Sequence, residues 1–174
     1  MIEVEVMGLD LSLAATGIAT EGGVRVVGTK PKDGDDIDRA DIILNGVVSH
    51  GFAVNQDTCT VWLESLISQG HQIHRLGMLH GIVRAGLRRM GIPVVLISPS
   101  KLKKYTTGKG VATKGVMIGQ AVRLLGYEGG NDNEADALWL RQMGLCATGQ
   151  DHVKMPKVNR SALDGVDLSP LEMS

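Results

Sequence analysis

The chain has 174 residues, of which 43% are hydrophobic and only 3% are aromatic. This length is enough for one domain with a core of aliphatic side chains, and the hydrophobic content excludes disorder throughout the chain. The net charge of −1 differs from the basic balance of many nucleic-acid-binding domains, so a surface of that kind has to be local.

The N-terminal part of the sequence alternates short apolar runs with turns. Residues 2–9, 16–20 and 24–29 predict three strands, the last two joined by the turn Glu21-Gly22-Gly23. Short strands joined by tight turns are typical of an antiparallel meander.

Beyond the polar loop at residues 30–36, helices and strands alternate. The apolar spacing predicts helices over 37–48, 72–90, 113–125 and 133–145, and strands over 58–63 and 94–97. This order predicts an α/β fold, in which a mixed five-stranded sheet combines the meander with two parallel strands and is flanked by helices.

The last part of the chain differs in composition. Residues 147–174 are polar, contain Pro156 and Pro170, and have few large apolar side chains. We therefore expect one domain over residues 1–146, followed by a mobile tail or an arm that docks on something else.

The sequence also indicates the cellular compartment. It has neither an evident N-terminal signal nor an apolar run of the about 20 residues that a membrane helix needs. Cys59 and Cys146 lie in apolar surroundings, as expected for reduced core cysteines. We expect a cytoplasmic protein without membrane contact.

Carboxylates occur where two predicted strands end and where the last helix begins. Asp10 follows the first apolar run, and Glu64 follows the strand at 58–63. Asp132 and Asp136 are four residues apart, so a helix would present both on one face, although Asp132 could instead be a plain N-cap. Oxygen ligands suit hard divalent cations, and two such ions about 4 Å apart catalyse phosphodiester hydrolysis. These four side chains are our candidate metal ligands.

A lysine-rich segment without any acidic residue precedes the helix at 113–125. A solvated loop would explain it, but Gly108 and Gly110 would also let backbone N–H groups approach phosphates. Lys114 opens the helix, where a cation opposes the helix dipole unless a phosphate relieves it. We therefore expect Lys114 to be the lysine nearest the phosphate group whose ester bond would be hydrolysed. The candidate DNA-binding residues are Lys101, Lys103, Lys104, Lys109 and Lys114.

These motifs, in this order, resemble the RuvC family of Holliday-junction resolvases, within the RNase H-like superfamily. The resemblance covers roughly residues 1–145. The matching segments are Gly8-Leu9-Asp10-Leu11-Ser12 with Thr16-Gly17, Val61-Trp62-Leu63-Glu64, the run from Ser98 to Lys114, and Asn133-Glu134-Ala135-Asp136-Ala137-Leu138.

The resemblance implies a structure-specific endonuclease that resolves four-way DNA junctions by paired nicks, leaving 5′-phosphate and 3′-hydroxyl ends. It implies a homodimer acting in the cytoplasm, which is the host cytoplasm if a phage encodes the chain. Each site would hold two Mg²⁺ ions, with Mn²⁺ as an accepted substitute. Asp10 would bind both metals, Glu64 the metal that activates water, and Asp136 would complete the site.

Two departures from the family pattern leave alternatives open. The fourth ligand of the family falls on Asn133, so either Asp132 or the amide of Asn133 could serve. The stretch directly after Glu64, Ser65-Leu66-Ile67-Ser68, lacks the aromatic residue that the family carries there, so Leu66 or Ile67 would have to act as the wedge that opens the junction.

Other readings of the same site remain. The acids would also suit a nuclease for flap DNA, Y-shaped DNA or RNA–DNA hybrid. A catalytically silent nucleic-acid-binding relative is the alternative that Asn133 supports. For the dimer, the small residues Gly77, Gly81 and Ala85 on one helix face are a candidate interface, with core packing as the alternative.

Overall fold

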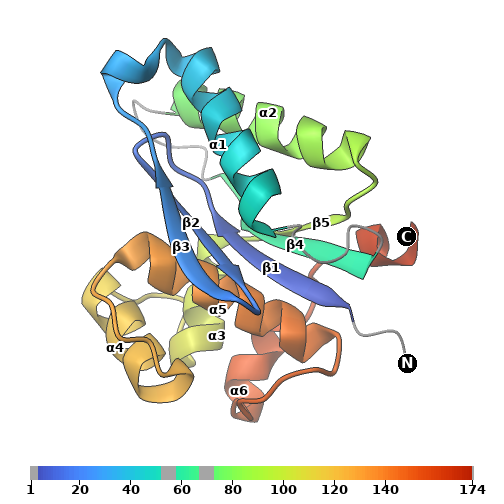
Figure 1. The fold of residues 1–174 in the computed structure, drawn as a ribbon. Helices are drawn as coiled ribbons and strands as arrows, with labels where there is room; N and C mark the ends of the chain where they lie inside the picture. Colours follow the sequence, from blue (N-terminus) through green and yellow to red (C-terminus); the bar gives the residue numbers. More distant parts are fainter. Residues whose placement is uncertain (1–3, 52–57, 67–72, 174) are drawn as a thin grey trace.

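A computed structural model describes residues 4–51, 58–66 and 73–173 of the chain. Its centre is a five-stranded sheet in the order β3-β2-β1-β4-β5 (Figure 1). The first three strands pair antiparallel, whereas β4 pairs parallel with β1 and β5 pairs parallel with β4. The predicted α/β fold with a mixed sheet is therefore confirmed. The strands are β1 (Glu5–Asp10), β2 (Ala15–Thr20), β3 (Gly23–Gly28), β4 (Cys59–Glu64) and β5 (Val94–Ile97).

Helices cover both faces of the sheet. In Figure 1, α1 and α2 lie on one side, whereas α3, α4, α5 and α6 lie on the other. The α-helices are α1 (Asp36–Gly51), α2 (Ile73–Arg89), α3 (Pro99–Thr107), α4 (Lys114–Leu125), α5 (Asp132–Ala147) and α6 (Lys157–Arg160). The 3-10 helices are η1 (Pro31–Asp33), η3 (Ser161–Leu163) and η4 (Ser169–Met173). Among the helices of the described ranges, none combines the length and apolar character that crossing a membrane requires.

Alternate side chains of the central strands divide the core into two halves. Val6 and Trp62 face α3, α4 and α5, whereas Met7 and Leu63 face α1 and α2. Side chains of a strand point to opposite faces in turn, so a strand buried on both faces is apolar throughout. A charged residue at the end of such a strand therefore lies at the edge of a dry core.

Part of the predicted basic loop is a helix. Ser98 is the N-cap of α3, with its side chain accepting from the Lys101 backbone N–H, and Pro99 takes the first helical position. Gly108 ends the helix with a positive φ of 79°. The cap signals were present in the sequence, but the surrounding lysines concealed the short apolar face formed by Leu102 and Tyr105, both buried.

The segment that follows α5 packs against the domain. Met155 and Ala162 are buried, and they join the core cluster that contains Leu102 and Tyr105 of α3. In Figure 1 this segment runs beneath α5, past α3, and ends beside β5. Its few apolar residues are thus placed where the domain can bury them.

Candidate active site

Two of the predicted carboxylates lie at the ends of neighbouring parallel strands. Asp10 is the last residue of β1 and Glu64 the last residue of β4. Leu9 pairs with Leu63, one position earlier on each strand, so the two acids are adjacent at the same edge of the sheet. The carboxyl ends of parallel strands are where ligand sites of α/β sheets form.

Two glycines allow α5 to lie directly on the sheet beside these acids. A Cβ atom on Gly8 of β1 would overlap the backbone carbonyl of Ala137, and one on Gly17 of β2 would overlap the carbonyl of Asn133. Any side chain at either position would therefore push the first half of α5 away from β1 and β2. The segments that resemble RuvC include both glycines, but the sequence did not indicate that they set the distance between α5 and the sheet.

The acids on α5 project from its first turns. Asp132 is the first residue of the helix, and Asn131 is its N-cap, with the side-chain oxygen accepting from the backbone N–H groups of Asn133 and Glu134. The cap role considered for Asp132 therefore belongs to Asn131. Asp132 is therefore not the cap, and it lies four residues before Asp136, on the face that both share.

Burial and mutual repulsion raise the pKa values of three of the acids. Burial, followed by the charges of Glu64 and Asp136, raises the pKa of Asp10 to about 8. Burial and then Asp136 raise the pKa of Glu64 to about 7, and burial and then Asp132 raise that of Asp136 to about 6. Electrostatic coupling of this kind requires proximity, so the structure brings the four predicted acids together.

Two lysines reach this group of acids. The Lys114 ammonium makes an ion pair with Asp132, and the hydrogen bond between them lowers the pKa of Asp132 and raises that of Lys114. The Lys103 charge lowers the pKa of both Glu64 and Asp136. Lys103 was expected only to contact DNA, so its closeness to the acids is a feature that sequence reasoning missed.

The other predicted lysines have different surroundings. The Lys101 ammonium donates to the backbone oxygens of Ala162, at 3.2 Å, and Asp164, both in the C-terminal segment. Lys104 is half-buried on α3, and Lys109 is exposed just after it. Of the two residues named as a possible wedge, Leu66 is 36% exposed, and Ile67 lies outside the described residues.

The donor atoms suit a hard divalent cation. All four acids supply carboxylate oxygens, and the buried Oδ1 of Asp136 has no hydrogen-bond partner among the described residues. Within the described ranges, however, no three acidic, histidine or cysteine side chains are already gathered as a formed metal site. The carboxylates repel one another, and the Asp132 carboxylate is ion-paired with Lys114. The residues therefore fit metal binding through small side-chain movements.

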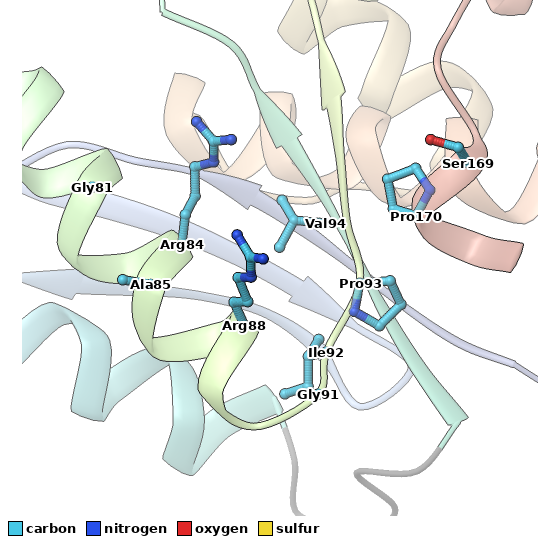
Figure 2. Close-up of a pocket in the computed structure, with 10 residues that line it drawn as sticks. All are labelled: Gly81, Arg84, Ala85, Arg88, Gly91, Ile92, Pro93, Val94, Ser169 and Pro170. Carbon is cyan, nitrogen blue, oxygen red and sulfur yellow. The ribbon is translucent and has the colours of Figure 1, made fainter. Parts of the chain in front are cut away.

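A cavity of about 620 Å³ lies away from these acids, between α2 and the C-terminal segment. In Figure 2, the side chains of Arg84 and Arg88 project from α2 on one side of it, and Ser169 and Pro170 lie on the other. Gly81 and Ala85, two of the small residues named above, also line this cavity. None of the described residues that line it is a carboxylate, so the cavity is separate from the candidate active site.

Comparison with solved structures defines the class of the fold. One match is a chain described as “Thermus thermophilus RuvC structure”, with a TM-score of 0.67 and 21% sequence identity. The match covers 88% of this chain and 100% of that chain. A second match, T. thermophilus RuvC in complex with Holliday junction substrate, has a TM-score of 0.63, 20% identity and the same coverage. The chain therefore has the RNase H-like fold of RuvC.

Sequence comparison leads to the same name over a shorter stretch. The chain is 45% identical over 65 residues to the crossover junction endodeoxyribonuclease RuvC of Anaeromyxobacter sp. strain Fw109-5, covering 37% of this chain and 32% of that protein. It is 43% identical over 63 residues to the RuvC of Anaeromyxobacter dehalogenans strain 2CP-1, covering 36% and 34%. The match spans about a third of the length of these relatives, and no family model matches the sequence. The predicted resemblance to RuvC is confirmed.

Proposed function

We propose that this chain is a metal-dependent endonuclease that cuts four-way DNA junctions. The observation that carries the proposal is the convergence of four acids, from β1, β4 and α5, with Lys103 and Lys114 beside them. Such a group of oxygen ligands next to cations suits hydrolysis of a phosphodiester, whose phosphate must be held close to carboxylates that would otherwise repel it. The RuvC names of its relatives support the junction as the substrate.

Asp10, Glu64, Asp136 and Asp132 would hold two Mg²⁺ ions, which supply Lewis-acid stabilisation and an activated water in enzymes of this type. The residues of the chain have distinct tasks. Lys114 approaches the scissile phosphate from the side of Asp132, and Lys103 balances negative charge near Glu64 and Asp136. The other lysines of α3 and of the following loop, Lys101, Lys104 and Lys109, bind the DNA backbone.

The direct test is a cleavage panel in the presence of Mg²⁺ with four-way junction, flap, Y-shaped DNA, RNA–DNA hybrid and plain duplex. We expect symmetric nicks in the junction with 5′-phosphate ends. Asp10→Asn and Asp136→Asn should abolish cleavage but keep junction binding or tighten it, because repulsion of the phosphate falls. Preference for another substrate would replace the junction assignment, and binding without any cleavage would identify a silent relative.

Two paired nicks require two active sites, so the proposal includes a homodimer with α2 as its interface. Gly81 is exposed on α2, and a Cβ atom added to it would meet no atom of the described ranges within 4 Å. The Gly81→Arg variant should therefore fold but remain a monomer by light scattering. The matched control is Gly119→Arg on the exposed face of α4, which also has open space and should not change the mass. A dimeric Gly81→Arg protein would exclude this face of α2.

A further inference from the structure

The C-terminal segment completes the end of the basic helix α3. The last carbonyl groups of a helix lack partners within that helix. The side-chain amide of Asn159, a buried residue of α6, donates to the Tyr105 carbonyl at 2.7 Å. Next to it, Val158 lies 3.6 Å from the position that a Cβ of Gly108 would take. α6 is therefore fixed at the point where α3 ends and the lysine-bearing loop begins.

A second attachment fixes the same segment along α3. The Lys101 ammonium donates to backbone oxygens of Ala162 and Asp164, so one of the lysines of α3 is bound to the segment. Met155 and Ala162 are buried on either side of α6. With burial at both ends and hydrogen bonds between them, residues 155–164 hold one position relative to α3.

This arrangement displays two cations beside α3. Lys157 and Arg160 are exposed, and their spacing of three places them on one face of α6. In the part of the chain that the structure describes, neither makes an ion pair. Lys154, in the same segment, differs because its ammonium lies 3.4 Å from the Asp151 carboxylate. The helix that carries these cations therefore contacts the lysine-bearing helix α3 at Tyr105 and Gly108, although the two helices are far apart in the sequence.

We propose that Lys157 and Arg160 form a second phosphate-binding row, which contacts the backbone of a duplex arm beyond the candidate active site. The inference rests on the proposed function, because it takes DNA as the partner. Continuity with the lysines of α3 favours DNA over an acidic protein, since a duplex presents evenly spaced phosphates over a long distance. The C-terminal segment then contributes affinity, and the group of carboxylates contributes chemistry.

The test compares salt dependence of junction binding in the inactive Asp10→Asn background, which needs no cleavage for its readout. The double variant Lys157→Ala/Arg160→Ala removes both cations, and Lys154→Ala is the matched control from the same segment. Each phosphate contact contributes about 0.9 to the log–log salt slope, so the double variant should lower the slope by about two. Its affinity deficit should then grow about 12-fold when salt falls from about 200 to about 50 mM. Lys154→Ala should keep the full slope.

A charge-conserving exchange, Lys157→Arg/Arg160→Lys, shows whether charge or packing is responsible. It should retain the slope, and all variants should melt as the parent does because the two side chains are exposed. An unchanged slope in the double alanine variant would overturn the inference, and α6 would then be only a structural cap of α3 or a site for an acidic protein. Failure of the proposed function would be seen separately, as absence of cleavage by the unmodified protein.

Discussion

The group of buried acids should make the metal-free protein less stable as pH rises. The pKa of Asp10 is 3.8 in an unperturbed chain and about 8 in the folded protein. Between these two values the folded state holds a proton that the unfolded state has released, so the folded state binds more protons. The resulting stabilisation is complete below pH 3.8, declines as pH rises, and is lost once pH passes about 8.

The size of the effect follows from the two pKa values. Each pH unit between them changes the free energy of unfolding by about 1.4 kcal/mol, which gives a ceiling of about 6 kcal/mol for Asp10. Burial also raises the pKa values of Glu64 and Asp136, so these two acids add a pH dependence of their own, which the Asp10 value does not include. For a domain of this length, about 1 kcal/mol corresponds to roughly 2–4 °C in melting temperature. A difference on the order of 10 °C is therefore within reach.

The perturbation is Asp10→Asn, which removes one charge and keeps the shape. Without divalent ions, we expect the unmodified protein to melt lower at pH 8 than at pH 5, and the variant to lose the part of this difference that Asp10 contributes. Mg²⁺ should raise the melting temperature of the unmodified protein at pH 8, because ligands that bind only the folded state stabilise it. The variant should respond less.

Circular dichroism melting in chelator and in Mg²⁺, at both pH values, measures these differences. Asp41→Asn, at an exposed position of α1, is the control and should behave as the unmodified protein. The reasoning fails if the unmodified protein melts equally at both pH values and Asp10→Asn melts no higher than it at pH 8.

The four acids could be predicted from the sequence because the pattern around each acid involves only neighbouring residues. An acid that ends an apolar strand, or two acids spaced by four on a helix, can be recognised without tertiary structure. The contact between α5 and the sheet could not be recognised in this way, since it depends on Gly8 and Gly17 meeting backbone atoms over a hundred residues away. The ion pair between Lys114 and Asp132 is likewise a tertiary contact.

The parts that the sequence did not predict have weak apolar patterns. α3 buries only Leu102, Tyr105 and Thr106 among its nine residues, so lysines dominate its periodicity. Residues 147–174 carry few large apolar side chains, and their burial depends on the surface that α3 presents. Short helices gain most of their stability from packing against the rest of the protein. The few apolar residues of such a segment do not reveal which surface will bury them.

Three further predictions concern single positions in the site. Lys114→Ala should reduce single-turnover cleavage by roughly 10²-fold at saturating enzyme, and a variant that only binds more weakly would remove the catalytic role. Asp132→Asn should reduce cleavage far more than Asn133→Ala, and the reverse ranking would make the amide the fourth ligand. Gly17→Ala tests the packing of α5 against β2, because the Cβ atom of the alanine would overlap the Asn133 carbonyl. Overpacking of this kind costs about 1–3 kcal/mol, so the variant should melt several degrees lower and, because the helix must move with its acids, cut more slowly at saturating Mg²⁺. The control is Gly22→Ala in the neighbouring turn, where the nearest atom to a Cβ is 3.6 Å away. If the two variants melt and cut alike, the close approach of α5 to β2 does not position the acids.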